Sequence, residues 1–151
     1  MKRIMLAICI IACSLSTQAQ NQIFSKYATI DGVDFVCINK AMFGLGTKMI
    51  SVAGGGEDLS KLGSLDKMLI ISSDSDGGKK QIDKDIRTLS TDKDYEVLMT
   101  SHSSGGDNMF IFTNKRKPHE LIIGTIGKDD SSMVVVVGDF SKEDISNFLN
   151  Q

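Results

Sequence analysis

The densest group of oxygen-bearing side chains in this sequence lies in the stretch SSDSDGGKKQID, residues 72–83. Counted as a twelve-residue calcium loop, it places Ser72, Asp74 and Asp76 at positions one, three and five, Gly77 at six and Asp83 at twelve. Such loops begin with Asp, end with a bidentate Glu and follow a helix. Here the first residue is Ser, the last is Asp, and two lysines follow the glycines. We therefore predict a serine-rich acidic loop before a helix and assign no metal site.

Histidine and cysteine provide no recognisable catalytic or metal-binding set. His102 and His119 are the only histidines, whereas a structural zinc site needs four ligands in recognisable pairs. Cys37 lies in an alternating apolar stretch, so we expect a buried and unreactive thiol. We assign no catalytic, cofactor-binding or metal-binding residue and expect no cofactor.

Two other short motifs have simple structural interpretations. Gly54–Gly56 lacks the Lys-Ser/Thr of a phosphate-binding loop and follows a predicted helix instead of opening one. Lys115–Lys117 is a basic tip of three charges, which indicates a solvated hairpin turn and not a binding patch.

The first residues have the anatomy of a secretory signal peptide. Lys2 and Arg3 form a positive start, an apolar run begins at Ile4, and a TQA cleavage sequence ends at Ala19. We therefore predict a signal peptide over residues 1–19 and one globular α+β domain over residues 20–151. The predicted location is the periplasm or the cell envelope.

Cys13 offers a second interpretation of the same segment. The sequence IIAC, ending at Cys13, resembles a lipobox, in which the acylated cysteine becomes the new N-terminus. We favour cleavage before Gln20, because cleavage at Cys13 shortens the apolar region and leaves only a short tether. Neither route leaves a transmembrane span, so membrane contact is expected only if Cys13 is lipidated.

Composition narrows the class of partner. The chain has 17 basic and 19 acidic side chains, and two of the basic ones, Lys2 and Arg3, lie in the predicted signal. The mature chain is therefore mildly acidic, which argues against nucleic acid as a partner. Cys37 is the only cysteine after residue 19, so no intramolecular disulfide can form.

Hydrophobic patterning predicts the order β-α-β-α-β-β-β-β-α. The expected strands are Val33–Ile38, Leu65–Ser72, Tyr95–Ser101, Asn108–Asn114, Glu120–Ile126 and Ser132–Val137. The first helix is expected to begin near Asn39 and end near Val52, and the second to run from about Lys79 to Leu89. A third is expected to start at a Ser141–Asp144 capping box. A short helical turn is expected at Glu57–Leu62.

The strand order suggests how the sheet is built. Leu65–Ser72 contains a run that is apolar on both faces, typical of a central parallel strand, so the first two strands and their helix are expected to form a right-handed βαβ unit. Short polar connections join the four later strands and predict an antiparallel meander. The predicted fold class is α+β, a two-layer sandwich of one mixed sheet with helices mainly on one face.

Five segments also carry a family resemblance. They are FSKY (residues 24–27), VDFVCINKAMF (33–43), YEVLM (95–99), MFIFTNK (109–115) and VVVVGDFSKEDI (134–145). In this order the chain resembles the domain-of-unknown-function family numbered 4252, small exported proteins common in Bacteroidetes. The resemblance implies an exported location and a shared fold, and it supplies no activity or catalytic residue.

Three hypotheses about function remain open. The favoured one is a non-catalytic envelope binding or interaction module that offers a sheet surface or edge to a partner, possible partners including another envelope protein. The second is a lipoprotein anchored through Cys13 with a structural or regulatory role. The third is an enzyme of unrecognised type, which a pocket of about 300 Å3 or more with convergent polar groups would favour.

Overall fold

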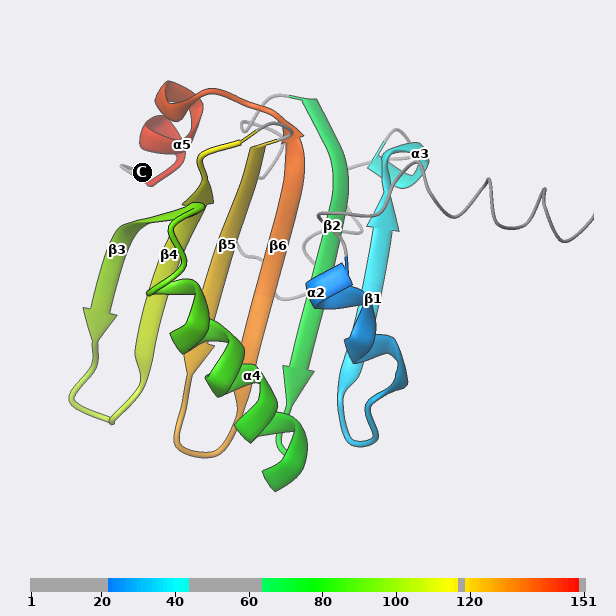
Figure 1. The fold of residues 1–151 in the computed structure, drawn as a ribbon, viewed down its shortest axis with the longest axis vertical. Helices are drawn as coiled ribbons and strands as arrows, with labels where there is room; N and C mark the ends of the chain where they lie inside the picture. Colours follow the sequence, from blue (N-terminus) through cyan, green and yellow to red (C-terminus); the bar gives the residue numbers. More distant parts are fainter. Residues whose placement is uncertain (1–21, 44–63, 117–118, 150–151) are drawn as a thin grey trace, which may run out of the picture.

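The computed structural model describes residues 22–43, 64–116 and 119–149 (Figure 1). Its helices are α2 (Gln22–Ser25), the 3-10 helix η1 (Lys26–Thr29), α3 (Lys40–Phe43), α4 (Asp76–Leu89) and α5 (Lys142–Leu149). Its strands are β1 (Asp34–Asn39), β2 (Ser64–Ser73), β3 (Tyr95–His102), β4 (Asn108–Asn114), β5 (His119–Ile126) and β6 (Ser131–Asp139).

The strands form one six-stranded sheet in the order β1-β2-β6-β5-β4-β3. Every neighbouring pair is antiparallel. The α+β class is therefore confirmed, and β3 to β6 form the expected antiparallel meander.

The predicted parallel βαβ unit is wrong, and so is the mixed sheet. β1 and β2 pair antiparallel, with Phe35 opposite Ile71 and Cys37 opposite Leu69. The apolar run of β2 has a different cause: the strand lies inside the sheet between β1 and β6, with apolar clusters on both of its faces. Burial on both faces produces a continuous apolar run whichever way the neighbours point.

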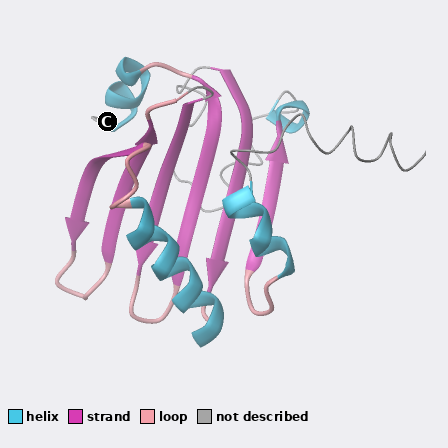
Figure 2. Cartoon of the chain, in the orientation of Figure 1, coloured by secondary structure: helices cyan, strands magenta, loops and turns pink. Residues whose placement is uncertain are grey.

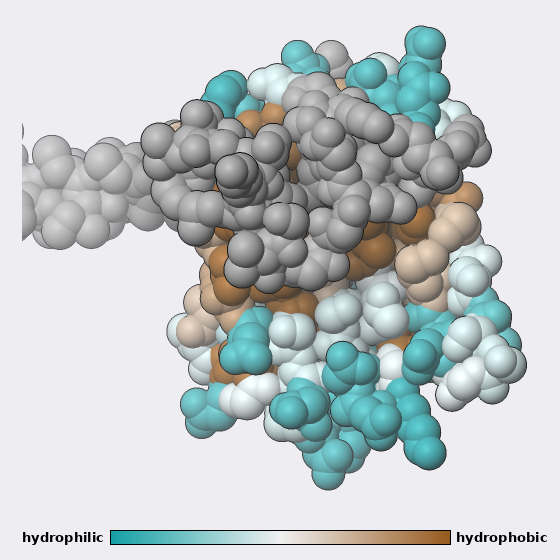
Figure 3. Space-filling model, turned by 180° about the vertical axis from the view of Figure 1, so that it is seen from behind, coloured by the Kyte–Doolittle hydropathy of each residue, from teal (hydrophilic) through white to brown (hydrophobic). Residues whose placement is uncertain are grey.

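Two apolar clusters lie on opposite faces of this sheet, because successive side chains of a strand point to opposite sides. The helix-face cluster includes Leu69 and Val135 with the apolar side of α4. The opposite-face cluster includes Met68 and Val136. Seen from behind, apolar side chains gather across the middle of that second face (Figure 3). The MVVVV run of β6 is therefore a core strand on both of its sides.

Helices contribute to both clusters. α2, η1 and α4 lie on one face of the sheet (Figure 2), where Phe24 and Tyr27 are fully buried beside Ile82 and Ile86. α5 instead contributes Ile145 to the opposite-face cluster. The segment before β1 thus supplies two of the largest buried side chains.

Two helix starts follow from side-chain capping. Ser75 accepts a hydrogen bond from the Gly78 backbone N–H at 3.2 Å, so α4 begins at Asp76, earlier than the predicted Lys79. At α5 the Ser141 N–H donates to Asp144 at 2.7 Å, and the Asp144 N–H donates to the Ser141 hydroxyl at 3.1 Å. This reciprocal pair is the predicted capping box, with Asp in the place of Glu.

Several sequence predictions fall outside the described residues. They concern the signal segment, Cys13, the continuation of the first helix past residue 43, the glycines at 54–56, the turn at 57–62 and Lys117. Asn39 itself ends β1, and α3 starts at Lys40. Within the described part of the chain, no helix is long and apolar enough to cross a membrane.

Candidate functional site

The serine side chains of the acidic loop before α4 form hydrogen bonds within the protein. The hydroxyls of Ser73 and Ser75 both donate to the Gly32 carbonyl, at 2.5 and 3.1 Å, and so fix the turn that precedes β1. Asp83 lies in the middle of α4 and accepts a hydrogen bond from Ser131 on β6. The residues of the calcium count are therefore divided among the end of β2, a loop and α4, and no group of three or more possible metal ligands occurs among the described residues.

The two histidines lie at opposite ends of the sheet. His102 is exposed at the end of β3, with its Nδ1 2.7 Å from Asn108 Oδ1. His119 starts β5 and is half-buried, with its ring centroid 6.0 Å from that of Phe140. The structure does not bring them together into a shared site.

The prediction of a buried Cys37 is wrong. This free thiol is exposed on β1, 3.7 Å from Asn39 Oδ1. The alternating pattern correctly indicates a strand, but among the described residues β1 is a terminal strand of the sheet and pairs only with β2. A side chain on an edge strand has fewer groups to cover it than one inside a sheet.

The sequence interpretation missed two tyrosine–carboxylate pairs, each with a buried carboxylate, the first of which joins η1 to α4. The Tyr27 hydroxyl donates to Asp85, which also accepts from Gln81 at 3.1 Å and pairs with Lys26 at 2.6 Å. Burial is the main cause that raises the pKa of Tyr27, and the hydrogen bond to Asp85 raises it further. The hydroxyl therefore stays protonated. A detectable signal was present: Asp85 interrupts the apolar stripe of α4, and a carboxylate there requires a buried partner.

The second pair joins three strands. The Tyr95 hydroxyl on β3 donates to Glu120 on β5 at 2.7 Å, and the Asn114 amide on β4 donates to the same oxygen at 3.5 Å. Glu120 is only 1% exposed. Burial raises the pKa of Glu120, and the bonds from Tyr95 and Asn114 oppose that rise. A general base must reach its substrate, whereas this carboxylate is enclosed and connects three strands through its hydrogen bonds.

The large apolar side chains that are exposed lie on two strands of the sheet. The large hydrophobic residues that are exposed among the described residues are Val36, Val97 and Met99, at 48%, 43% and 37%. Val36 lies on β1, and the other two lie on β3. These are the two terminal strands of the sheet in the described part of the chain, so the exposed apolar side chains lie at its edges.

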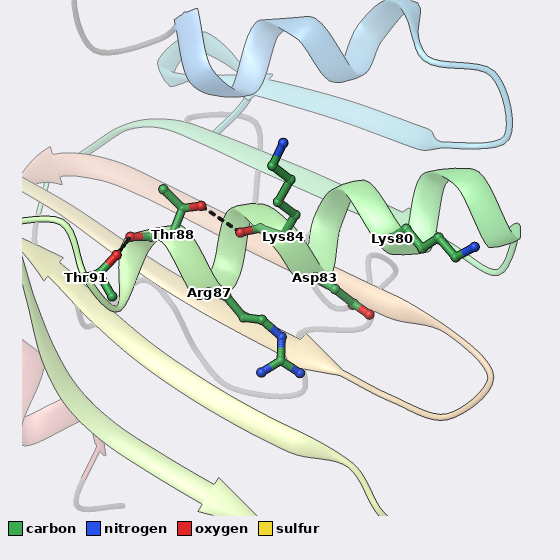
Figure 4. Close-up of a pocket in the computed structure, with 6 residues that line it drawn as sticks. All are labelled: Lys80, Asp83, Lys84, Arg87, Thr88 and Thr91. Atoms are coloured by element: carbon green, nitrogen blue, oxygen red, sulfur yellow. Dashed lines mark hydrogen bonds between the residues drawn. The ribbon is translucent and has the colours of Figure 1, made fainter.

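A polar depression of about 480 Å3 lies along the outer face of α4. It is lined by Lys80, Asp83, Lys84, Arg87, Thr88 and Thr91. Figure 4 shows Lys84 extending to the opposite side of the helix from Asp83 and Arg87. The depression therefore has the size of a small-molecule site but lacks the converging polar groups of one.

A comparison with protein families identifies the chain. The sequence model of a family described as "Domain of unknown function (DUF4252)" matches residues 27–148, most of the chain. The protein belongs to the DUF4252 family. No curated protein and no solved structure matches it.

The family match covers the elements that build both polar pairs in this DUF4252 protein. It begins at Tyr27 and extends through Asp85, Tyr95 and Glu120 into α5. The contacts Tyr27–Asp85 and Tyr95–Glu120 join residues 58 and 25 positions apart. The first pair connects η1 to α4, and the second connects β3 to β5.

Glu120→Gln should change how the stability of this DUF4252 protein depends on pH. Because the folded protein raises the pKa of Glu120, the folded state binds a proton more tightly than the unfolded state. The stability that this tighter proton binding contributes to the wild type is present below the unfolded pKa of about 4.3. It is lost as pH rises through the folded pKa. Thermal unfolding from acidic to neutral pH should therefore show Glu120→Gln gaining stability over the wild type as pH rises.

Glu143→Gln provides the matched control, because Glu143 is exposed in the first turn of α5. The difference in stability between Glu143→Gln and the wild type should not follow the pH trend expected for Glu120→Gln. A Glu120→Gln difference that stays constant or shrinks with rising pH would contradict the assignment.

Proposed function

We propose that this protein is an exported, non-catalytic interaction module of the cell envelope, and that it binds a partner by adding a strand to β3. The partner contributes an extended segment that pairs with the free backbone edge of β3. Another envelope protein fits the predicted location. In this mode main-chain hydrogen bonds provide affinity and side-chain contacts provide specificity.

The observation that supports this proposal is the exposure of Val97 and Met99 on the terminal strand β3. A terminal strand presents unpaired N–H and C=O groups along its outer edge, which a second strand can use. Val97 lies opposite Phe112 and Met99 opposite Ile111, so the two project to opposite faces of the sheet. An added strand could cover both of them.

The accessible part of β3 begins after Glu96. Near its start, Glu96 pairs with Lys142 of α5 at 3.0 Å, so α5 lies close to that end. From Met99 to His102 every residue is exposed. The register irregularity lies between Val97 and Met99, and pairing with β4 is regular beyond it. We therefore place the docking segment over residues 97–102.

Two alternatives accompany this proposal. Lipidation at Cys13 would tether the same module to a membrane leaflet and would leave the β3 edge available. An enzyme of unrecognised type would need convergent polar groups, and the splayed side chains around the α4 depression do not support that alternative.

The combined variant Val97→Lys and Met99→Lys should prevent strand addition while leaving the fold intact, because both side chains are already exposed. Placing charges on an edge is a common way to block pairing with a second strand. In affinity capture from envelope extracts, the wild type should retain a partner that the variant binds about tenfold or more weakly, a loss of at least about 1.4 kcal/mol.

Val36→Lys on the other edge is the matched control and should retain the partner. In the complex, hydrogen exchange should slow at the outward-facing amides of residues 97–102. Equal capture by wild type and the β3 variant would contradict the proposal. If Val36→Lys lost the partner and the β3 variant retained it, the binding edge would be β1 instead of β3.

A further inference from the structure

Three cations on the outer face of α4 have no acidic partner in the described part of the chain. Lys80, Lys84 and Arg87 are all exposed. The ion pairs among the described residues involve Lys26, Lys40, Arg116 and Lys142 instead. The whole chain carries more acidic than basic side chains, so this face is a local positive patch on an acidic protein.

The acidic residues of α4 do not cancel that patch. Asp85 is buried against η1, where Lys26 and Tyr27 bind it. Asp83 lies beside the three cations in the same depression and also accepts a hydrogen bond from Ser131 on β6, so it offsets one of their charges. Asp76 lies in the first turn, at the start of the helix. Three exposed cations therefore outnumber the acidic groups along the rest of the outer face.

The shape of the patch favours an extended anion over a small one. Its cations spread along the helix and diverge, with Lys84 and Arg87 extending to different sides (Figure 4). The hydroxyls of Thr88 and Thr91 donate within the helix, to the carbonyls of Lys84 and Thr88 at 2.8 and 3.0 Å. No donor set encloses a single phosphate, whereas a broad anionic surface can contact all three cations together.

The start of the described chain lies on the same face of the sheet. α2 and η1 pack beside α4 in the helix-face cluster. Cys13 precedes Gln22 by nine residues, a span of at most about 30 Å when extended. If Cys13 were lipidated, this segment would be short enough to keep the helix-bearing face of the sheet within reach of the lipid headgroups.

We propose that the α4 face, formed by Lys80, Lys84 and Arg87, docks on the anionic headgroups of a membrane surface. The contact is electrostatic and reversible, and it uses a surface separate from the β3 edge. Clusters of basic side chains bind anionic lipid surfaces through their summed charge, and salt weakens this attraction. Docking through α4 would orient the domain relative to the bilayer.

Vesicle flotation tests this proposal with the predicted mature chain, residues 20–151, which lacks Cys13 and the apolar signal segment. One set of vesicles contains equal parts phosphatidylglycerol and phosphatidylcholine, and the other contains phosphatidylcholine alone. We expect stronger binding to the anionic vesicles, and the excess should decrease with added salt. Changing Lys80, Lys84 and Arg87 together to Gln should weaken the excess binding on the order of 100-fold, about fivefold per cation.

The control changes Lys93, Lys115 and Lys128 to Gln, which alters charge equally at exposed turn positions, and it should retain the excess. Lys84→Gln alone, with a fivefold effect, replaces the triple variant if thermal unfolding shows that the latter does not fold. Equal binding to both vesicle types, unchanged binding of the α4 variant, or an equal loss in the control would overturn the proposal. Capture by soluble polyglutamate without any preference for anionic vesicles would assign the face to an acidic protein and would also overturn it.

Discussion

Val135→Asp and Val136→Asp are each expected to abolish folding. The two residues are 1% and 0% exposed, and they belong to the helix-face and opposite-face clusters respectively. Burying a carboxylate without a partner costs several kcal/mol, against a total stability of roughly 5–15 kcal/mol for a domain. The alternation of β6 predicts that at least one of the two is in the core, and the structure places both there.

Solubility, circular dichroism and thermal unfolding measure this outcome. Val36→Asp is the matched control, because it makes the same change at a valine that is 48% exposed on β1. That variant should fold and melt close to the wild type. If either β6 variant were soluble with a normal melting transition, the assignment of its side of the strand to a core would be wrong.

Gly124→Val is expected to destabilise the protein by about 1–3 kcal/mol through overpacking between α4 and the sheet. A Cβ at Gly124 would lie 2.9 Å from both Cδ1 and Cγ1 of Ile86, which is fully buried. Ile86→Ala alone should cost about 2–5 kcal/mol, because it leaves a cavity at the same position. Combined, the two changes should cost less than the sum of the single effects, because the valine occupies space that the isoleucine leaves.

Chemical denaturation of the two single variants and the double variant measures this coupling. Residues in direct contact show interaction energies of about 0.5–3 kcal/mol. Gly77→Val is the control, because a Cβ at Gly77 meets no atom within 4 Å. Strict additivity of Gly124→Val and Ile86→Ala would show that α4 does not rest on β5 at this point.

Local patterns predicted most of the elements in the described part of the chain. β4 has the predicted bounds, Asn108–Asn114, and β5 and β6 extend the predicted strands by one or two residues at their ends. The stripe Ile82, Ile86 and Leu89 faces the core as expected. These predictions succeeded because strand alternation and helical spacing are properties of neighbouring residues.

The errors concern residues that are far apart in the chain. Strand β2 has the same apolar pattern whether its neighbours are parallel or antiparallel, so its sequence could not give the direction of β1. Cys37 has the pattern of a core residue, and only the place of β1 at the edge exposes it. The position of Asp85 indicated that it needs a buried partner but not that this partner is Tyr27, and Glu120 gave no local sign of Tyr95.

The sequence by itself therefore determined the strands of the meander, the apolar stripe of α4, the α5 cap and the family resemblance, since each depends on residues within a few positions of one another or on the order of short motifs. Tertiary structure alone decided the antiparallel pairing of β1, the exposed thiol, the tyrosine–carboxylate pairs and the apolar side chains at the sheet edges. The physical reason is that exposure and hydrogen bonding depend on which distant strand or helix covers a side chain. The candidate interaction edge and the basic face of α4 both belong to this second group.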